Sequence, residues 1–114
     1  MRKDTKARDI PKKVKEAVAD RDSFDGWPCC INCGQPAPAE NRLAFSNAHF
    51  ISRAQGGLGA EENTLTLCPP CHRRYDQTTD RPKLREYFRA YLEDHYPDWD
   101  ESKLYYRRNG YGQE

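Results

Sequence analysis

The sequence has little apolar material and no long apolar run. Of its 114 residues, 36% are hydrophobic and 32% are charged, so few residues are available for a core. No segment approaches the roughly 18 consecutive apolar residues of a transmembrane helix. The basic N-terminal stretch MRKDTKARDIPKKVK is not followed by an apolar run, unlike a secretory signal peptide. We therefore expect a cytoplasmic protein without a membrane partner, folded as a single domain over residues 1–114.

The sequence also lacks an excess of charge of either sign. It has 19 Lys and Arg residues and 18 Asp and Glu residues, for a net charge of +1. Recognition by bulk positive charge is thereby excluded, and any phosphate contact must come from local basic clusters. Four such clusters are present: Arg2/Lys3/Lys6/Arg8, Lys12/Lys13/Lys15, Arg73/Arg74 and Arg107/Arg108. Taken alone, each cluster is more consistent with a solvated surface than with a binding site.

Cysteine is abundant for so short a chain. Four of the five cysteines form two Cys-x-x-Cys pairs, Cys30 with Cys33 and Cys68 with Cys71. In a reducing cytosol such pairs bind metal more often than they form disulfides, and a thioredoxin-like redox pair requires a βαβ context that this sequence lacks. Four thiolates make a closed structural zinc site, a staple that small cores often need. We predict structural Zn²⁺ on these four residues, with Cys29 packing beside the site or replacing Cys30.

Helices are expected near both ends of the chain, with two short strands between them. The spacing of Val14, Ala17 and Val18 predicts an early helix, with Asp9 as its cap. The stretch FDGWPCCINCGQPAPAENR reads as turns. The expected elements are a helix over 11–20, a strand within 43–51, a second strand at TLTLC, and helices over about 70–77, 82–95 and in the last residues before 107.

Three polar residues lie between and beside the cysteine pairs. His49 sits in the apolar run NAHFIS, where a lone histidine is usually a buried core residue. His72 directly follows Cys71 and could be an alternative zinc ligand or a surface residue. Asn63 opens the second strand, where asparagine often caps a turn. Each residue is a weak signal alone. Their order along the chain, His49, Gly56-Gly57, Asn63 and His72, is a specific pattern.

The segment AHFISRAQGGLGAEENTLTLCPPCHRRYD, with CCINC upstream, resembles the HNH endonuclease family over about residues 28–77. The resemblance implies a ββα-metal, treble-clef-like fold, in which two antiparallel strands and a helix surround one catalytic metal. We therefore expect a small α+β, zinc-stapled domain with flanking helices at about 11–20 and 82–107. Small phage-borne HNH proteins are similar in size, so other phage or host DNA-processing proteins are candidate partners. The oligomeric state is left open.

The resemblance implies a role for each matching residue. His49 would be the general base that activates the water attacking a DNA phosphodiester, a role that suits a neutral imidazole. Asn63 would hold the loop so that His49 points correctly, and His72 would bind the catalytic Mg²⁺, Mn²⁺ or Ni²⁺. The candidate phosphate contacts are Arg53, Arg73 and Arg74. The expected activity is nicking of DNA, one strand for each active site.

One position departs from the family pattern. Most family members carry a metal-binding Asp or His directly before the base histidine, and here that residue is Ala48. Asp76 is the best replacement, because it lies four residues after His72 and so shares a helix face with it. Asn47 is a weaker candidate. The departure leaves two alternatives open: a zinc-stabilised DNA-binding module without catalysis, and a zinc knuckle that binds proteins.

Overall fold

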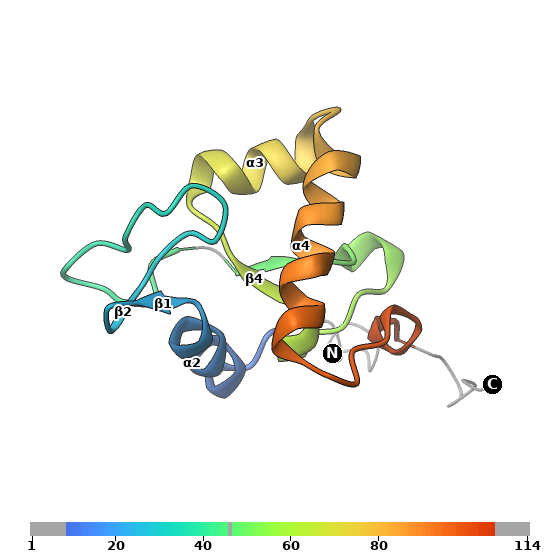
Figure 1. The fold of residues 1–114 in the computed structure, drawn as a ribbon, viewed down its shortest axis with the longest axis horizontal. Coiled ribbons are helices and arrows are strands. Elements are labelled where there is room, and N and C mark those ends of the chain that lie inside the picture. The colour runs from blue at the N-terminus through green and yellow to red at the C-terminus, as the bar shows by residue number, and fades with distance from the viewer. Residues whose placement is uncertain (1–8, 46, 107–114) are drawn as a thin grey trace.

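The computed structural model describes residues 9–45 and 47–106, and this part of the chain has the expected α+β architecture (Figure 1). It contains three α-helices and two small antiparallel sheets. No helix in the described ranges is long and apolar enough to cross a membrane. The elements are α2 (Lys12–Arg21), β1 (Ser23–Phe24), β2 (Trp27–Pro28), β3 (Asn47–His49), β4 (Thr64–Thr66), α3 (Pro69–Gln77) and α4 (Arg81–His95).

The first described helix, α2, begins one residue later than expected, and the predicted cap is wrong. Pro11 occupies the N-cap position, and no side chain caps the helix. Asp9 lies two residues before this position, too early for the bond that an N-cap side chain makes to the second or third helical N–H. It instead accepts a hydrogen bond from the guanidinium of Arg53 at 2.8 Å. The basic clusters at Arg2/Lys3/Lys6/Arg8 and Arg107/Arg108 lie outside the described residues.

A short hairpin lies in the stretch that was expected to form turns only. β1 and β2 pair antiparallel, with Phe24 opposite Trp27. The two residues between them, Asp25 and Gly26, both have positive φ angles, 54° and 84°. Asp-Gly in this conformation makes the type I′ turn that fits the twist of a two-residue hairpin. The strands of this hairpin are only two residues long, too short for the alternation of side chains that would predict a strand from sequence.

The central unit consists of two strands followed by a helix, as expected. β3 and β4 pair antiparallel, and His49 lies opposite Thr64. α3 begins at Pro69. Proline suits the first turn of a helix, because an N–H group there would have no acceptor within the helix. The final expected helix is shorter than predicted and is a 3-10 turn at Glu101–Leu104.

α4 covers this unit with its apolar face and descends from the end of α3 (Figure 1). Leu84, Phe88 and Leu92 are buried, and the ring of Phe88 packs edge-on against Tyr75 of α3, with centroids 5.1 Å apart. Tyr87, also on this helix, is 51% exposed. The cluster of buried side chains takes residues from both strands, α3, α4 and the 3-10 turn.

A buried ion pair fixes α2 to the rest of the fold. The side chains of Arg21 and Asp22 are only 8% and 0% exposed and pair at 2.7 Å. Arg21 also donates to the carbonyl oxygens of Glu61 and Thr64. Asp22 accepts hydrogen bonds from the Thr66 amide and the Tyr91 hydroxyl. The pair therefore links α2 to β4 and α4.

The charges of this pair stabilise each other. Burial alone lowers the pKa of Arg21, but the hydrogen bonds and negative charge of Asp22 outweigh burial and raise it. Burial, followed by the bond to Asp22, raises the pKa of the Tyr91 hydroxyl. Arg21 is therefore a cation, and Tyr91 a neutral donor, throughout the physiological range.

We expect Arg21→Met to lower the free energy of unfolding by about 3–5 kcal/mol, because it leaves the Asp22 carboxylate buried without its cation. Urea denaturation measures the loss. Lys12→Ala is the control: it breaks the exposed pair between Lys12 and Glu16 and should cost less than about 1 kcal/mol. Equal losses in both variants would contradict a stabilising role for the buried pair.

Candidate active site

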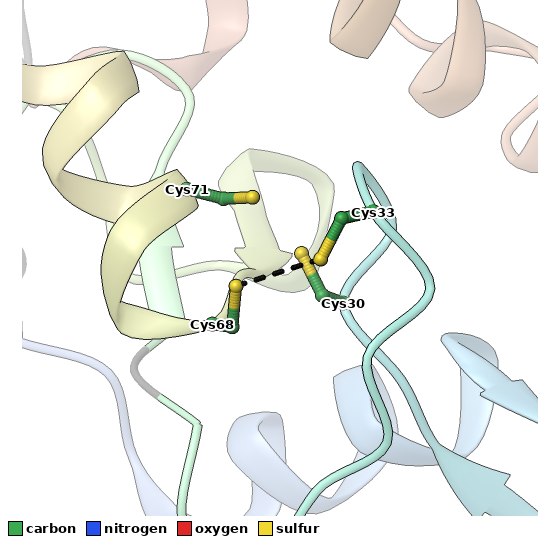
Figure 2. A group of neighbouring side chains, drawn as sticks. All are labelled: Cys30, Cys33, Cys68 and Cys71. Atoms are coloured by element: carbon green, nitrogen blue, oxygen red, sulfur yellow. Dashed lines mark hydrogen bonds between the residues drawn. The ribbon is translucent and has the colours of Figure 1, made fainter.

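Four cysteine side chains converge from two distant turns (Figure 2). Cys30 and Cys33 come from the turn after β2, and Cys68 and Cys71 from the start of α3. Their sulfur atoms all lie within 4.8 Å of one another, and all four thiols are free of disulfides. Cys29 stays outside this group, and its thiol lies 3.4 Å from the Trp27 carbonyl oxygen. The cluster could hold a structural metal ion.

The surroundings of the cluster shift the thiol pKa values of Cys30, Cys68 and Cys71 in different directions. Burial raises the pKa of Cys68 to about 12 and also raises that of Cys71. At Cys30 the backbone N–H groups of neighbouring residues outweigh burial and lower the pKa. The Asn32 amide donates to the Cys71 sulfur at 3.3 Å. The donors to Cys30 and Cys71 favour the thiolate form that binds a metal, whereas the burial of Cys68 and Cys71 opposes it.

A cleft of about 740 Å³ is lined by residues of β3 and α3. His49 of β3 and His72 of α3 both line it, although 22 positions separate them in the sequence. Asp76 and Arg53 line it as well. The fold thus brings together four of the residues that the sequence singled out.

His72 and Asp76 lie in contact on one face of α3. The His72 Nε2 atom is 2.9 Å from the Asp76 Oδ2 atom, and the two side chains are 26% and 40% exposed. Among the described residues, the four cysteines are the only group of three or more potential metal ligands. His72 and Asp76 are a pair and not a larger cluster, so they could provide at most two ligands to an ion in the cleft.

Asn63 holds the loop that follows His49. Its side chain is fully buried. Its Oδ1 atom accepts from the Ile51 amide at 2.7 Å, and its Nδ2 atom donates to the carbonyl oxygens of Ile51 and Leu58. These three bonds satisfy backbone groups that no strand partner reaches. They fix the chain two residues after His49.

Gly57 permits this close contact. A β-carbon on Gly57 would lie 1.7 Å from the Ile51 carbonyl oxygen and 2.9 Å from the Asn63 Nδ2 atom. No side chain fits there without displacing backbone. Gly57 therefore leaves the space in which the Asn63 side chain bonds to the backbone of this loop.

The three arginines suggested as phosphate contacts lie in different surroundings. Arg53 lines the cleft and pairs with Asp9 at 2.8 Å. Arg73 borders a shallow hollow that also touches His72 and Asp76. Arg74 lies outside both and pairs with Asp80, whose hydrogen bond and charge raise its pKa. The structure thus brings Arg53 and Arg73, but not Arg74, to the surface around His72.

The segment from the first cysteine pair to the end of α3 matches a protein family. The family model described as HNH endonuclease matches residues 30–78. Residues 30–78 are thus similar to the HNH endonuclease family. This segment includes the cysteine cluster, both strands of the central sheet and α3. The family comprises endonucleases, and its domains act on DNA. No curated protein matches the chain.

Within the matched segment, Ala48 faces the core. Ala48 is fully buried in the apolar cluster, whereas its neighbours Asn47 and His49 line the cleft. This follows from the alternation of side chains along a strand. A carboxylate at position 48 would therefore be buried. Of positions 47 and 48, only Asn47 can offer a side-chain oxygen to the cleft.

Two further residues reach the site without any signal in the sequence motif. Lys15 of α2 lines the cleft, although the sequence marked it only as part of a basic cluster. Arg81 donates to the Asp76 Oδ1 atom at 3.4 Å. Both belong to flanking helices outside the matched segment, so only their tertiary packing could reveal them.

Proposed function

We propose that the protein is a metal-dependent HNH endonuclease that hydrolyses DNA phosphodiester bonds. The observation that carries this proposal is the convergence of His49, His72 and Asp76 on one open cleft. Two imidazoles and one carboxylate in one cleft would supply a proton acceptor and a cation-binding pair. One such cleft per chain would cut one DNA strand at a time.

In this proposal His49 is the general base. A neutral imidazole accepts a proton at neutral pH, and His49 would take it from the water that attacks the phosphorus atom. Asn63 would act through the backbone, by keeping the chain after His49 in place. Their roles differ: His49 contacts the reacting water, and Asn63 positions His49.

His72 and Asp76 would hold the catalytic Mg²⁺, Mn²⁺ or Ni²⁺. Two ligands at adjacent corners of an octahedral Mg²⁺ site, each about 2.1 Å from the ion, are about 3 Å apart. The 2.9 Å between His72 Nε2 and Asp76 Oδ2 fits this spacing. When bound, the ion supplies Lewis acidity to the scissile phosphate and neutralises charge on the leaving oxygen.

Basic residues at the cleft would hold the DNA. Lys15 and Arg53 lie at the cleft, and Arg73 borders a second hollow that His72 and Asp76 also line. Phosphates near the cut could thus be bound without a large net charge. Arg53 would exchange its pairing with Asp9 for a phosphate, and the exposed pair costs little to break. Arg74 remains a candidate for a more distant phosphate.

The cysteine cluster would hold structural zinc. Four sulfur atoms about 2.3 Å from a tetrahedral zinc lie about 3.8 Å apart, close to the 3.6 Å between Cys33 and Cys68. With four protein ligands the ion would have no open position for substrate. A reducing intracellular compartment would suit these free thiols. The similarity in size to small phage-borne HNH proteins would fit a phage-encoded protein.

A second candidate function is a zinc-stabilised DNA-binding module without catalysis. The observation that favours it is the burial of Ala48, at the position where most family members carry a metal ligand. Such a module would retard DNA in a gel without cutting it at any metal concentration. A zinc knuckle that binds proteins would do neither.

The zinc proposal predicts one zinc ion per chain by elemental analysis and unfolding upon strong chelation, because metal binding contributes to folding. Cys33→Ser should lose the metal. Cys29→Ser should keep it, because Cys29 lies outside the cluster. A protein without zinc, or a melting curve that chelation leaves unchanged, would refute structural zinc.

The nuclease proposal predicts nicking of supercoiled plasmid with Mg²⁺ or Mn²⁺ and none after EDTA. His49→Ala should lower the nicking rate by about 10²–10⁴-fold, the usual contribution of a general base, with an unchanged melting temperature. His95→Ala is the control, because His95 lies exposed at the end of α4. Normal cutting by His49→Ala would rule out the mechanism.

The ligand proposal predicts opposite changes at two positions. Asp76→Ala should raise the Mn²⁺ concentration for half-maximal nicking, because it removes one of two protein ligands. Asn47→Asp should lower it by adding a carboxylate to the cleft. Asp94→Ala, at an exposed position of α4, is the control. The same Mn²⁺ dependence in wild type and Asp76→Ala would remove Asp76 from the site.

A further inference from the structure

We propose that Arg81 is a positioning residue for the catalytic ion, which holds Asp76 so that one carboxylate oxygen stays turned toward His72. This inference rests on the proposed nuclease function. Arg81 is the first residue of α4 and lies three residues beyond the segment that the family model matches. It would therefore be a part of the site that this chain supplies from outside the HNH segment.

The two oxygen atoms of Asp76 have different neighbours. Oδ1 accepts from the Arg81 guanidinium at 3.4 Å, and Oδ2 lies 2.9 Å from the His72 Nε2 atom. A carboxylate whose first oxygen is held by a cation can offer its second oxygen in a fixed direction. Here that direction is toward His72, the proposed second ligand.

Arg81 is itself held in place by three further contacts. Its guanidinium donates to the carbonyl oxygens of Tyr75 at 3.2 Å and Phe50 at 3.3 Å. It also lies over the Tyr75 ring, 4.1 Å from the centroid. The Tyr75 hydroxyl donates to the same Phe50 carbonyl at 2.9 Å.

These contacts connect the two halves of the proposed site. Phe50 directly follows His49, and Tyr75 directly precedes Asp76. Arg81 therefore joins the backbone beside the base to the backbone and side chain of the proposed metal ligand. Only a planar group with several donors can reach all three acceptors at once, and an ammonium group cannot replace it.

Two effects of Arg81 on a bound cation oppose each other. Its positive charge disfavours a second cation nearby, but the Arg81 and Asp76 side chains are 25% and 40% exposed, so solvent and salt screen this repulsion. Residues that orient a metal ligand account for about 10–100-fold in metal affinity. A site with only two protein ligands depends strongly on their orientation, so we expect the positioning effect to be larger.

The test compares two variants of Arg81. Arg81→Lys keeps the positive charge but loses the planar guanidinium with its several donors, and Arg81→Met loses both. The readouts are the Mn²⁺ concentration for half-maximal nicking and, without DNA, Mn²⁺ binding to zinc-loaded protein by electron paramagnetic resonance. Both variants should weaken Mn²⁺ binding roughly tenfold and recover near wild-type nicking at saturating Mn²⁺. Arg85→Lys is the matched control, because Arg85 lies over the Phe50 ring and pairs with Glu101.

A double-mutant comparison shows whether Arg81 acts through Asp76. In the Asp76→Ala background, Arg81→Lys should cause no further loss of Mn²⁺ binding, since coupled residues are not additive. Equal losses in both backgrounds would overturn the proposal. So would unchanged Mn²⁺ binding with a lowered melting temperature, which indicates a structural role, or tighter binding in Arg81→Met, which indicates repulsion.

Failure of the proposed function gives a different result. A wild-type protein that fails to cut DNA with Mg²⁺, Mn²⁺ or Ni²⁺ would refute the nuclease activity. The comparison of Mn²⁺ binding between wild type, Arg81→Lys and Arg85→Lys would still decide whether Arg81 orients a metal ligand. A wild-type protein that nicks DNA, with an unchanged Mn²⁺ dependence in both Arg81 variants, would refute only the role of Arg81.

Discussion

The convergence of four cysteine sulfur atoms is the constraint on which the site depends. It joins the turn after β2 to the start of α3, so the chain between them must leave this point and return to it. The outgoing part contains β3 with His49, and the returning part contains β4 and leads into α3. The distance between His49 and His72 is therefore set by the closure of this loop.

Hydrogen bonds to the backbone shape the interior of the loop. A short segment after His49 has backbone groups without strand partners, and leaving them unsatisfied in a buried place would be costly. Asn63 satisfies them, and Gly57 leaves the space that this requires. Tyr75 bonds to the same segment from α3. Polar bonding thus gives the loop a definite shape in a chain with a small apolar core.

The flanking helices complete the HNH segment. The Arg21–Asp22 pair fixes α2 against β4, and α2 then contributes Lys15 to the cleft. α4 supplies apolar cover through residues such as Phe88, and its first residue, Arg81, reaches Asp76. A nearly neutral chain can in this way gather basic side chains at one cleft. The cleft is a property of the whole described fold, although the family motif covers only part of it.

The sequence by itself determined the α+β class, the approximate positions of both central strands and of α3 and α4, and the four-cysteine cluster. The elements and the cysteine cluster follow from short-range rules of spacing, periodicity and residue type, and the α+β class follows from the resemblance to the HNH endonuclease family. Only the tertiary structure decided that Ala48 faces the core, that Asp9 pairs with Arg53, and that Arg81 reaches Asp76. The physical reason is that motif spacing is local, whereas these contacts depend on how the flanking segments pack and on which face of a strand each side chain occupies.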